Sequence, residues 1–197
     1  MSKLQVIGIC GKARSGKDTV AAHLVHNHGF FRIALADGVR SAFSDLDGVT
    51  WERRKELEAA NKTARWALQI LGTECRTYFD TADHWIDHLL IKIIYMSQHH
   101  PRPQFRFVIP DIRSPNEQDV LARTLSELAD LVIVGLSRPD SGLTGEQATH
   151  SSETGVDEVQ CDERIVNDKG IPELRGKVDW LIHERFEQQP KQELALA

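Results

Sequence analysis

Short apolar runs recur along the chain and alternate with longer segments of helical periodicity. Nearly unbroken runs at Leu4 to Cys10, Phe105 to Pro110 and Leu131 to Leu136 predict buried strands. Runs without polar alternation are typical of parallel strands that helices cover on both faces. Shorter stretches predict two further strands, at Phe30 to Ala36 and at Glu163 to Val166. The pattern therefore predicts an α/β protein of three layers, α/β/α, around a central and mostly parallel sheet.

The segments between these strands are predicted to be helical. Thr19 to His28 has apolar residues at core spacing and ends at a glycine, and Asp83 to His99 has an inward apolar face. Ser114 to Glu117 begins a helix with proline in its first turn, and Ile171 to Phe186 closes the fold. Further helices are expected at 36–43 with Asp37 as N-cap, at 51–62 and at 63–79.

The first predicted strand runs into a glycine-rich turn, LQVIGICGKARSGKDTVA. Gly11 and Gly16 lie in the turn and Lys17 opens the next helix, which gives the spacing GxxxxGK between a strand and a helix. Backbone N–H groups of such a turn and the positive end of the helix dipole form a site for a polyphosphate. We therefore expect a nucleotide-binding loop with Lys17 on the β- and γ-phosphates; a glycine turn without a ligand is the alternative. The loop comprises Gly11, Lys12, Ala13, Arg14, Ser15, Gly16, Lys17, Asp18 and Thr19.

One position of this loop departs from the usual pattern. The residue after the lysine is normally Ser or Thr, whose hydroxyl contacts Mg²⁺, and here it is Asp18, followed by Thr19. The helix dipole favours a carboxylate in the first turn. The carboxylate would repel phosphate unless it points away or reaches the metal through water, so Asp18 is a candidate Mg²⁺ residue.

Composition and charge narrow the function classes. The 24 basic and 29 acidic residues give a net charge of −5, which provides no electrostatic footprint for duplex nucleic acid or a membrane surface. Three scattered cysteines without CxxC spacing favour a reducing compartment, and neither a disulfide framework nor a zinc site. We expect no signal peptide and no membrane span, and hence a soluble intracellular protein. The chain is expected to form one domain at 1–187 with a flexible tail at 188–197.

Polar residues that follow the predicted strands are candidates for substrate binding. Asp111 and Arg113 come directly after Phe105 to Pro110, at the strand end that faces the ligand crevice of a parallel sheet. Asp111 is placed to act on Mg²⁺ or a substrate hydroxyl, and Arg113 to neutralise phosphate. Arg40 lies one turn into the helix after Phe30 to Ala36 and points to the same crevice; a solvated arginine is the equal alternative.

The helix predicted at 63–79 has two distinct faces. One is an apolar stripe. The other carries two arginines, an amide and a glycine, and glycine costs up to about 1 kcal/mol in a helix interior. This face is interpreted as a binding wall for a phosphate and a base; a solvated face with an Arg76–Asp80 pair is the alternative. The stripe is Leu68, Leu71, Cys75 and Tyr78, and the basic face is Arg65, Gln69, Gly72 and Arg76.

The segment 137–155, SRPDSGLTGEQATHSSETG, has no apolar periodicity and follows a strand at the crevice end. It predicts a mobile lid, with Arg138 at its hinge and Glu153 at its far end. A plain solvated loop is the alternative. His84, His88, His99 and His100 invite a metal site, which we reject because no carboxylate or cysteine completes a tetrahedral set at motif spacing.

Several segments now assembled occur together in one family. GKARSGKDT, ALADGVR, LQILGTECR with a tryptophan nine residues later, PDIRSPNE, HSSET and VNDKGIPEL stand in this order along the chain. Over almost its whole length the sequence resembles phage-type deoxynucleoside monophosphate kinases. The resemblance implies a P-loop NTPase fold and transfer of the γ-phosphoryl group of ATP, with Mg²⁺, to a deoxynucleoside monophosphate (dNMP). It also implies a homodimer that supplies DNA precursors in the cytoplasm of an infected bacterium.

The resemblance and the residues together assign expected roles. Lys17 follows the moving phosphoryl group, Arg113 lies where the two phosphates meet, and Arg138 or Arg14 stabilises transition-state charge. The acceptor is expected in a helical part at about 37–100, under the lid at about 137–155. Its expected contacts are Asp37, Arg40, Arg65, Gln69, Glu74, Arg76, Trp85, Asp111, Arg113 and Glu153, with core packing the favoured role for Trp85.

Two rival functions stay open at this point. One is a P-loop kinase of another small phosphorylated metabolite. The other is a sensor that binds ATP without turnover. Substrate profiling separates the first from a dNMP kinase, and release of ADP with and without a monophosphate acceptor identifies the second, because a sensor would release none.

Overall fold

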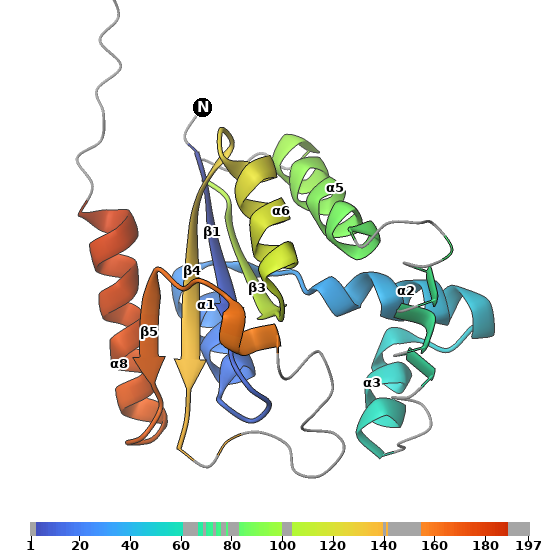
Figure 1. The fold of residues 1–197 in the computed structure, drawn as a ribbon, viewed down its shortest axis with the longest axis horizontal. Coiled ribbons are helices and arrows are strands. Elements are labelled where there is room, and N and C mark those ends of the chain that lie inside the picture. Colours follow the sequence, from blue (N-terminus) through green and yellow to red (C-terminus); the bar gives the residue numbers. More distant parts are fainter. Residues whose placement is uncertain are drawn as a thin grey trace, which may run out of the picture.

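The computed structural model describes residues 3–60, 67–68, 70–72, 74–75, 78, 83–99, 104–139, 141 and 155–188. These residues contain a five-stranded sheet in the order β2-β3-β1-β4-β5 (Figure 1). All four neighbouring pairs are parallel, which confirms the prediction from the apolar runs. The strands are β1 Leu4–Cys10, β2 Phe31–Arg32, β3 Arg106–Ile112, β4 Ala129–Ser137 and β5 Glu163–Val166.

Helices cover both faces of the sheet. One apolar cluster joins α1 (Lys17–His28) and α8 (Ile171–Ile182) to one face, and a second joins α5 (His84–His99) and α6 (Pro115–Leu125) to the other. This is the predicted three-layer arrangement, and α2 and α3 extend to one side of it (Figure 1). The remaining elements are α2 Leu35–Asp47, α3 Trp51–Ala60, the 3₁₀ turn η2 Gly155–Glu158 and the π-helical turn η3 His183–Glu187.

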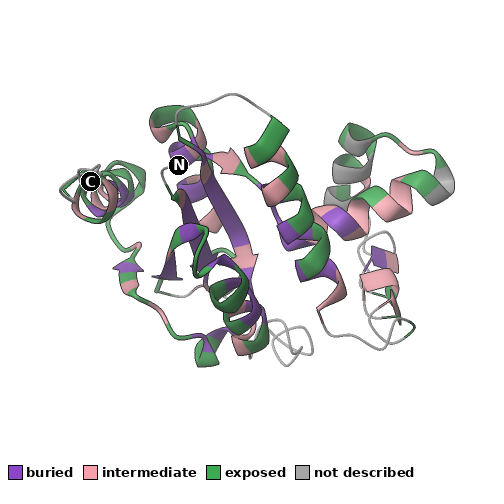
Figure 2. Ribbon diagram, turned by 90° about the horizontal axis from the view of Figure 1, so that it is seen from above, coloured by how far each residue is buried: buried purple, intermediate pink, exposed green. Residues whose placement is uncertain are grey.

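The central strand β1 is anchored from both layers. Successive side chains of a strand point to opposite faces, so Val6 joins the α5–α6 cluster and Ile7 joins the α1–α8 cluster. Figure 2 shows the strands buried in the middle, with exposed residues on the outer sides of the helices. Fully burying one such aliphatic side chain contributes about 1.5–3 kcal/mol. The carboxyl end of β1 is therefore a rigid base for the turn that follows it.

The start of α2 differs from the prediction. β2 covers two residues and not the whole of 30–36, because the chain turns into α2 at Leu35. Asp37, predicted as the N-cap, is the third residue of the helix, and Ala34 is the N-cap. The Asp37 carboxylate instead accepts a hydrogen bond from the backbone N–H of Ala34 at 2.9 Å. It thus reaches back to the helix start as the acidic member of a capping box does.

Parts of the helix predicted at 63–79 lie within the described residues and are helical there. Leu68 is buried as predicted, whereas Tyr78 is 83 % exposed, so the apolar stripe does not extend to it. A Cβ added to Gly72 would lie 3.6 Å from Val39 and 4.0 Å from the indole nitrogen of Trp85. Gly72 therefore packs beside α2 and α5 at ordinary contact distance. The binding wall stays a prediction, because Arg65, Gln69 and Arg76 lie outside the described residues.

The other predicted elements agree with the structure to within a few residues. Examples are the strand at Glu163–Val166, the helix that starts after Ser114 and the long helix that ends at His99. Within the described part of the chain, no helix has both the length and the hydropathy needed to cross a membrane.

Candidate active site at the phosphate loop

The loop between β1 and α1 has the backbone geometry of a glycine-rich turn. Gly11 has a φ of 151° and Gly16 a φ of 109°. A Cβ at position 11 would lie 2.3 Å from the carbonyl oxygen of Leu136, and one at position 16 would lie 2.7 Å from Nδ2 of Asn167. The loop passes so close to its neighbours that a larger residue at either position would force a displacement.

Lys17 is the first residue of α1, and its ammonium group folds back over the loop. Its Nζ donates hydrogen bonds to the carbonyl oxygens of Gly11, at 2.5 Å, and of Lys12, at 2.8 Å. The N-cap of α1 is Gly16, which has no side chain to accept from the first backbone N–H groups of the helix. The loop thus combines an ammonium group with the positive end of a helix, which is the setting that a phosphate group requires.

Two residues that the sequence analysis did not single out hold this loop from outside. The side-chain Nδ2 of Asn167, just after β5, donates to the carbonyl oxygen of Ser15 at 3.0 Å, and Asn167 N–H donates to Ser137 at 2.8 Å. Lys12 forms an ion pair of 3.0 Å with Asp157 in η2. These contacts join distant parts of the chain, so the sequence does not predict them. The one local indication is that Asn167 lies in a polar turn directly after a strand.

The carboxyl ends of β1 and β3 lie side by side, since Cys10 pairs with Ile112. Asp111, predicted to follow the strand, lies within β3 near its end. Its two carboxylate oxygens accept hydrogen bonds from the backbone N–H groups of Leu35, at 2.9 Å, and Ala36, at 3.0 Å. These are the first two residues of α2. Asp111 therefore attaches the start of α2 to the sheet next to the strand that carries the phosphate loop.

The first turns of α2 contain the predicted pair Asp37 and Arg40. A carboxylate oxygen of Asp37 lies 3.4 Å from Nη1 of Arg40, and the other lies 3.5 Å from Nη1 of Arg32. The Asp37 and Arg40 side chains are only 15 % and 22 % exposed. The guanidinium of Arg40 is consequently oriented by a largely buried carboxylate, at the end of α2 that Asp111 holds.

Trp85 is a core residue. It is 4 % exposed, and its indole Nε1 donates a hydrogen bond of 2.9 Å to the carbonyl oxygen of Gly72. A Cβ on Gly38 in α2 would lie 2.9 Å from its ring. The ring is enclosed between α2 and the segment around Gly72, which agrees with the core role favoured from the sequence, so we assign Trp85 no contact with substrate.

Several of the charged residues predicted for the site are exposed. Arg113 directly follows β3, and its backbone N–H donates to the buried carboxylate of Glu117 at 2.7 Å, which fixes the turn into α6. Arg138 directly follows β4. Exposed side chains are those of Arg14, Asp18, Glu74, Arg113 and Arg138.

Some predictions fall on residues outside the described ones. They include most of the proposed lid, at 140 and 142–154, and the tail at 189–197. The roles expected there stay predictions. The individual site residues concerned are Arg65, Gln69, Arg76 and Glu153.

Cys10 ends β1 and lies beneath the loop. Its Sγ is 3.3 Å from the Sγ of Cys161, so two cysteines that are far apart in the sequence are in contact. Burial raises the pKa of the Cys10 thiol to about 12, and the hydrogen bond with Cys161 adds to the increase. Because the reactive form is the thiolate, such a thiol is a poor nucleophile at neutral pH. Cys10 belongs to the α5–α6 core cluster, and we assign it a packing role.

The sequence matches a family model. The model of the deoxynucleotide monophosphate kinases matches residues 50–178, which is more than half of the 197 residues. A candidate deoxynucleotide monophosphate kinase of Acanthamoeba polyphaga mimivirus is 27 % identical over 188 residues, covering 88 % of this chain and 93 % of the viral protein.

The fold is similar to that of solved structures. The crystal structure of TT1252 from Thermus thermophilus superimposes with a TM-score of 0.51 at 16 % identity, over 93 % of this chain and 98 % of that one. At this level of identity the likeness concerns the fold alone. Together with the parallel sheet and the GxxxxGK loop between β1 and α1, it agrees with a P-loop NTPase fold.

Proposed function

The chain belongs to the deoxynucleotide monophosphate kinase family, and we propose that it transfers the γ-phosphoryl group of ATP to a dNMP, giving the diphosphate. One observation supports this most strongly. The phosphate loop after β1 and the start of α2, held by Asp111 of β3, lie at the adjoining carboxyl ends of two paired strands. ATP bound at the loop and a dNMP bound at α2 would thus meet at the carboxyl end of the sheet.

The loop Gly11–Thr19 would hold the β- and γ-phosphates of the donor. Backbone N–H groups of the loop and of the first turn of α1 would donate to phosphate oxygens. Lys17 would exchange its bonds to the Gly11 and Lys12 carbonyl oxygens for phosphate oxygens. Since these carbonyls lie within the same loop, the ammonium group would stay near the phosphoryl group throughout transfer.

Carboxylate oxygens at this end of the sheet fit Mg²⁺. Asp18 offers an exposed carboxylate in the first turn of α1. Each Asp111 oxygen accepts one backbone N–H and has a second lone pair. Mg²⁺ prefers oxygen ligands and keeps several waters, so both residues would hold it through water. When bound, the ion neutralises charge on the β- and γ-phosphates.

The acceptor would lie against α2, in the helical part at about 37–100. Arg40, oriented by Asp37, would bind the acceptor's phosphate, and Arg113 would lie where donor and acceptor phosphates meet. Phosphoryl transfer depends mainly on how the reactants are positioned and on neutralisation of their phosphate charge. Arginines on two neighbouring elements would contribute to both. Further acceptor contacts are proposed for Arg65, Gln69, Glu74, Arg76 and Glu153.

The segment at about 137–155 would close over the two nucleotides as a lid. Arg138 stands where this segment leaves β4, and Arg14 lies in the loop itself. Either guanidinium would add positive charge at the transferring group. Closure would exclude water, which otherwise accepts the phosphoryl group.

The test is release of ADP from Mg-ATP with a panel of dNMPs, with ribonucleoside monophosphates and with no acceptor. We expect release that requires a dNMP. Lys17→Ala should lower kcat about 10²–10³-fold, the range for loss of one transition-state cation or donor, without unfolding the protein. Lys92→Ala, on an exposed part of α5, is the matched control and should retain full activity. Acceptor-independent release would indicate an ATPase, and turnover only with a different phosphorylated metabolite would indicate another kinase.

The resemblance to phage enzymes also leads us to propose a homodimer that supplies DNA precursors in the cytoplasm of an infected bacterium. Light scattering on the purified full chain tests the dimer. A mass near 22.2 kDa would contradict it, because that is the mass of one chain.

A further inference from the structure

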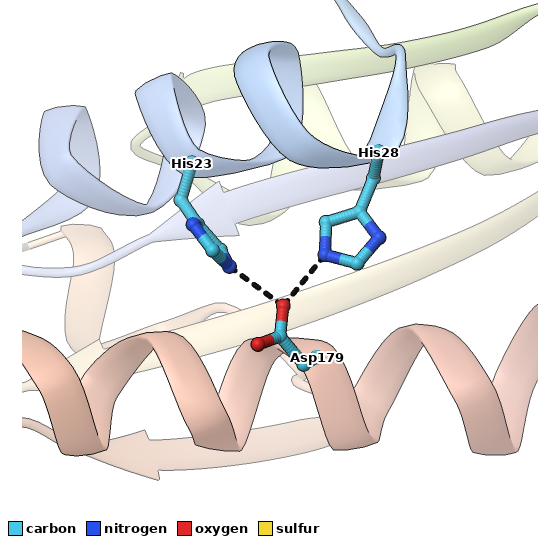
Figure 3. Close-up of side chains that lie close together, drawn as sticks. All are labelled: His23, His28 and Asp179. Carbon is cyan, nitrogen blue, oxygen red and sulfur yellow. Dashed lines mark hydrogen bonds and ion pairs between the residues drawn. The ribbon is translucent and has the colours of Figure 1, made fainter.

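Away from the phosphate loop, two histidines and an aspartate converge between α1 and α8 (Figure 3). His23 lies in the middle of α1, His28 is its last residue, and Asp179 lies in α8. The Nε2 atoms of both histidines are 2.6 Å from the same carboxylate oxygen, Oδ1 of Asp179. The three donor atoms all lie within 4.8 Å of one another. Such a set has the size of the inner shell of one metal ion.

The burial of the three side chains differs in a way that suits a coordination site. The side chains of His23 and His28 are 6 % and 16 % exposed, whereas that of Asp179 is 52 % exposed. The imidazole rings meet edge to face, at an interplanar angle of 75°, so they approach the carboxylate from two directions. The histidines form the closed side of the site, and the aspartate stands at an opening through which water can complete the coordination.

Metal binding changes the protonation of these side chains, because the ion would replace the Nε2 protons that now lie between the histidines and Asp179. A metal needs an ionised carboxylate and a lone pair on each Nε2. In a neutral histidine the proton then sits on Nδ1. The Nδ1 of His23 has no hydrogen-bond partner within the described residues, so this tautomer change breaks no existing contact there.

We propose that His23, His28 and Asp179 form a binding site for one divalent transition-metal ion of the zinc class. Two imidazole nitrogens and one carboxylate oxygen are ligands that Zn²⁺ and its neighbours Co²⁺ and Ni²⁺ accept. Mg²⁺ favours six oxygens, so the site differs in chemistry from that of the proposed Mg²⁺ at the phosphate loop.

Only a small movement is needed to admit the ion. With metal–ligand bonds of about 2.0–2.1 Å, tetrahedral ligand atoms lie about 3.3 Å apart, compared with the present 2.6 Å from each Nε2 to Oδ1. The half-exposed Asp179 would move outward by less than about 1 Å. The ion would then connect α8 to α1, the helix that Lys17 begins.

Calorimetric titration of the chelator-treated full chain with ZnCl₂, in the absence of nucleotide and Mg²⁺, tests the proposal. We expect one tight equivalent. Free Zn²⁺ at 100 times the Kd should raise the Tm by about 5–11 °C, from mass action and the size of the protein. Asp179→Asn and His28→Gln should each weaken binding at least about 10-fold. His26→Gln, on an exposed position of the same helix, is the matched control and should bind as the unaltered chain does.

Co²⁺ spectroscopy identifies the ligands. Visible bands of a nitrogen- and oxygen-ligated Co²⁺ that disappear in Asp179→Asn would support the proposal. Near-ultraviolet charge-transfer bands from thiolate would assign the ion to cysteines and overturn it. Equal Zn²⁺ affinity in all four chains, or no stoichiometric binding, would overturn it as well. If Asp179→Asn failed to fold by circular dichroism, His28→Gln would decide. No readout here involves turnover, so failure of this proposal and failure of the proposed kinase activity are distinguishable.

Discussion

Asn167 offers the sharpest test of how the phosphate loop is held. Its side chain connects the turn after β5 to the loop through one hydrogen bond, from Nδ2 to the carbonyl oxygen of Ser15. Ser15 itself has no exposed surface. Asn167→Ala removes the donor and leaves the carbonyl of this buried residue without the bond.

The expected cost follows from that burial. Leaving a buried acceptor unsatisfied costs about 1–3 kcal/mol. For a chain of 150–250 residues each kcal/mol lowers the Tm by about 2–4 °C, so the Tm should fall by about 2–12 °C. If the nucleotide-bound loop needs the same bond, each kcal/mol should also raise the KM for ATP about 5-fold. The KM for the acceptor should not change, because the contacts of the Asn167 side chain among the described residues are with Ser15 and Gly16 of the loop.

The assay combines thermal unfolding with ADP-release kinetics at varied ATP and at varied dNMP. Asn167→Asp should be worse than Asn167→Ala, since it turns a donor into an acceptor that faces the Ser15 carbonyl. Asp168→Asn is the neighbouring control, because Asp168 makes a surface ion pair with Lys177 and such pairs contribute about 0–1 kcal/mol. An unchanged Tm together with an unchanged KM for ATP in Asn167→Ala would refute the reasoning.

Three further predictions follow from other contacts. Asp111→Ala, which frees the first two N–H groups of α2, should lower the free energy of unfolding by about 0.5–2 kcal/mol, as loss of a helix cap does, when measured in urea; no change would show that the cap is unimportant. Cys10, with a pKa of about 12, should resist iodoacetamide at pH 8 until the protein is unfolded, because about one thiol in 10⁴ is then ionised; alkylation of the native protein, mapped by mass spectrometry, would contradict this. Trp85→Phe should destabilise the fold by about 1 kcal/mol through loss of the hydrogen bond to Gly72, and leave the KM for the acceptor unchanged; a raised KM with normal stability would instead indicate contact with the base.

The elements that the sequence predicts well are those with local causes. The phosphate loop depends on two glycines and a lysine at fixed spacing, and the structure has the required positive φ at Gly11 and Gly16. The buried strands are continuous apolar runs, and the helix after Ser114 has its N-cap and its proline adjacent in sequence. In each case a window of about ten residues contains the physical reason.

The features that the sequence does not predict arise from contacts between distant residues. Asp37 resembles an N-cap by residue type, yet α2 begins earlier because Asp111, 76 positions from Leu35, accepts from its backbone. In the sequence Asn167 is an ordinary turn residue, and only the position of β5 in the sheet places it against the loop. In the sequence His23 and His28 are ordinary helix positions, and only the packing of α8 on α1 places Asp179 between them.

The attachment of α2 through Asp111 determines how that helix can move. A rotation that keeps the two hydrogen bonds must pivot at Leu35 and Ala36, with the strand end as the fixed support. The helix has 13 residues, so at a rise of 1.5 Å per residue its far end lies about 20 Å from the pivot, and a 10° swing would displace Gly48 by about 3 Å. Such a lever would barely disturb Arg40 near the pivot. It would carry α3 through the largest arc, so the opening at the proposed acceptor side would change while the start of α2 keeps its position relative to the phosphate loop.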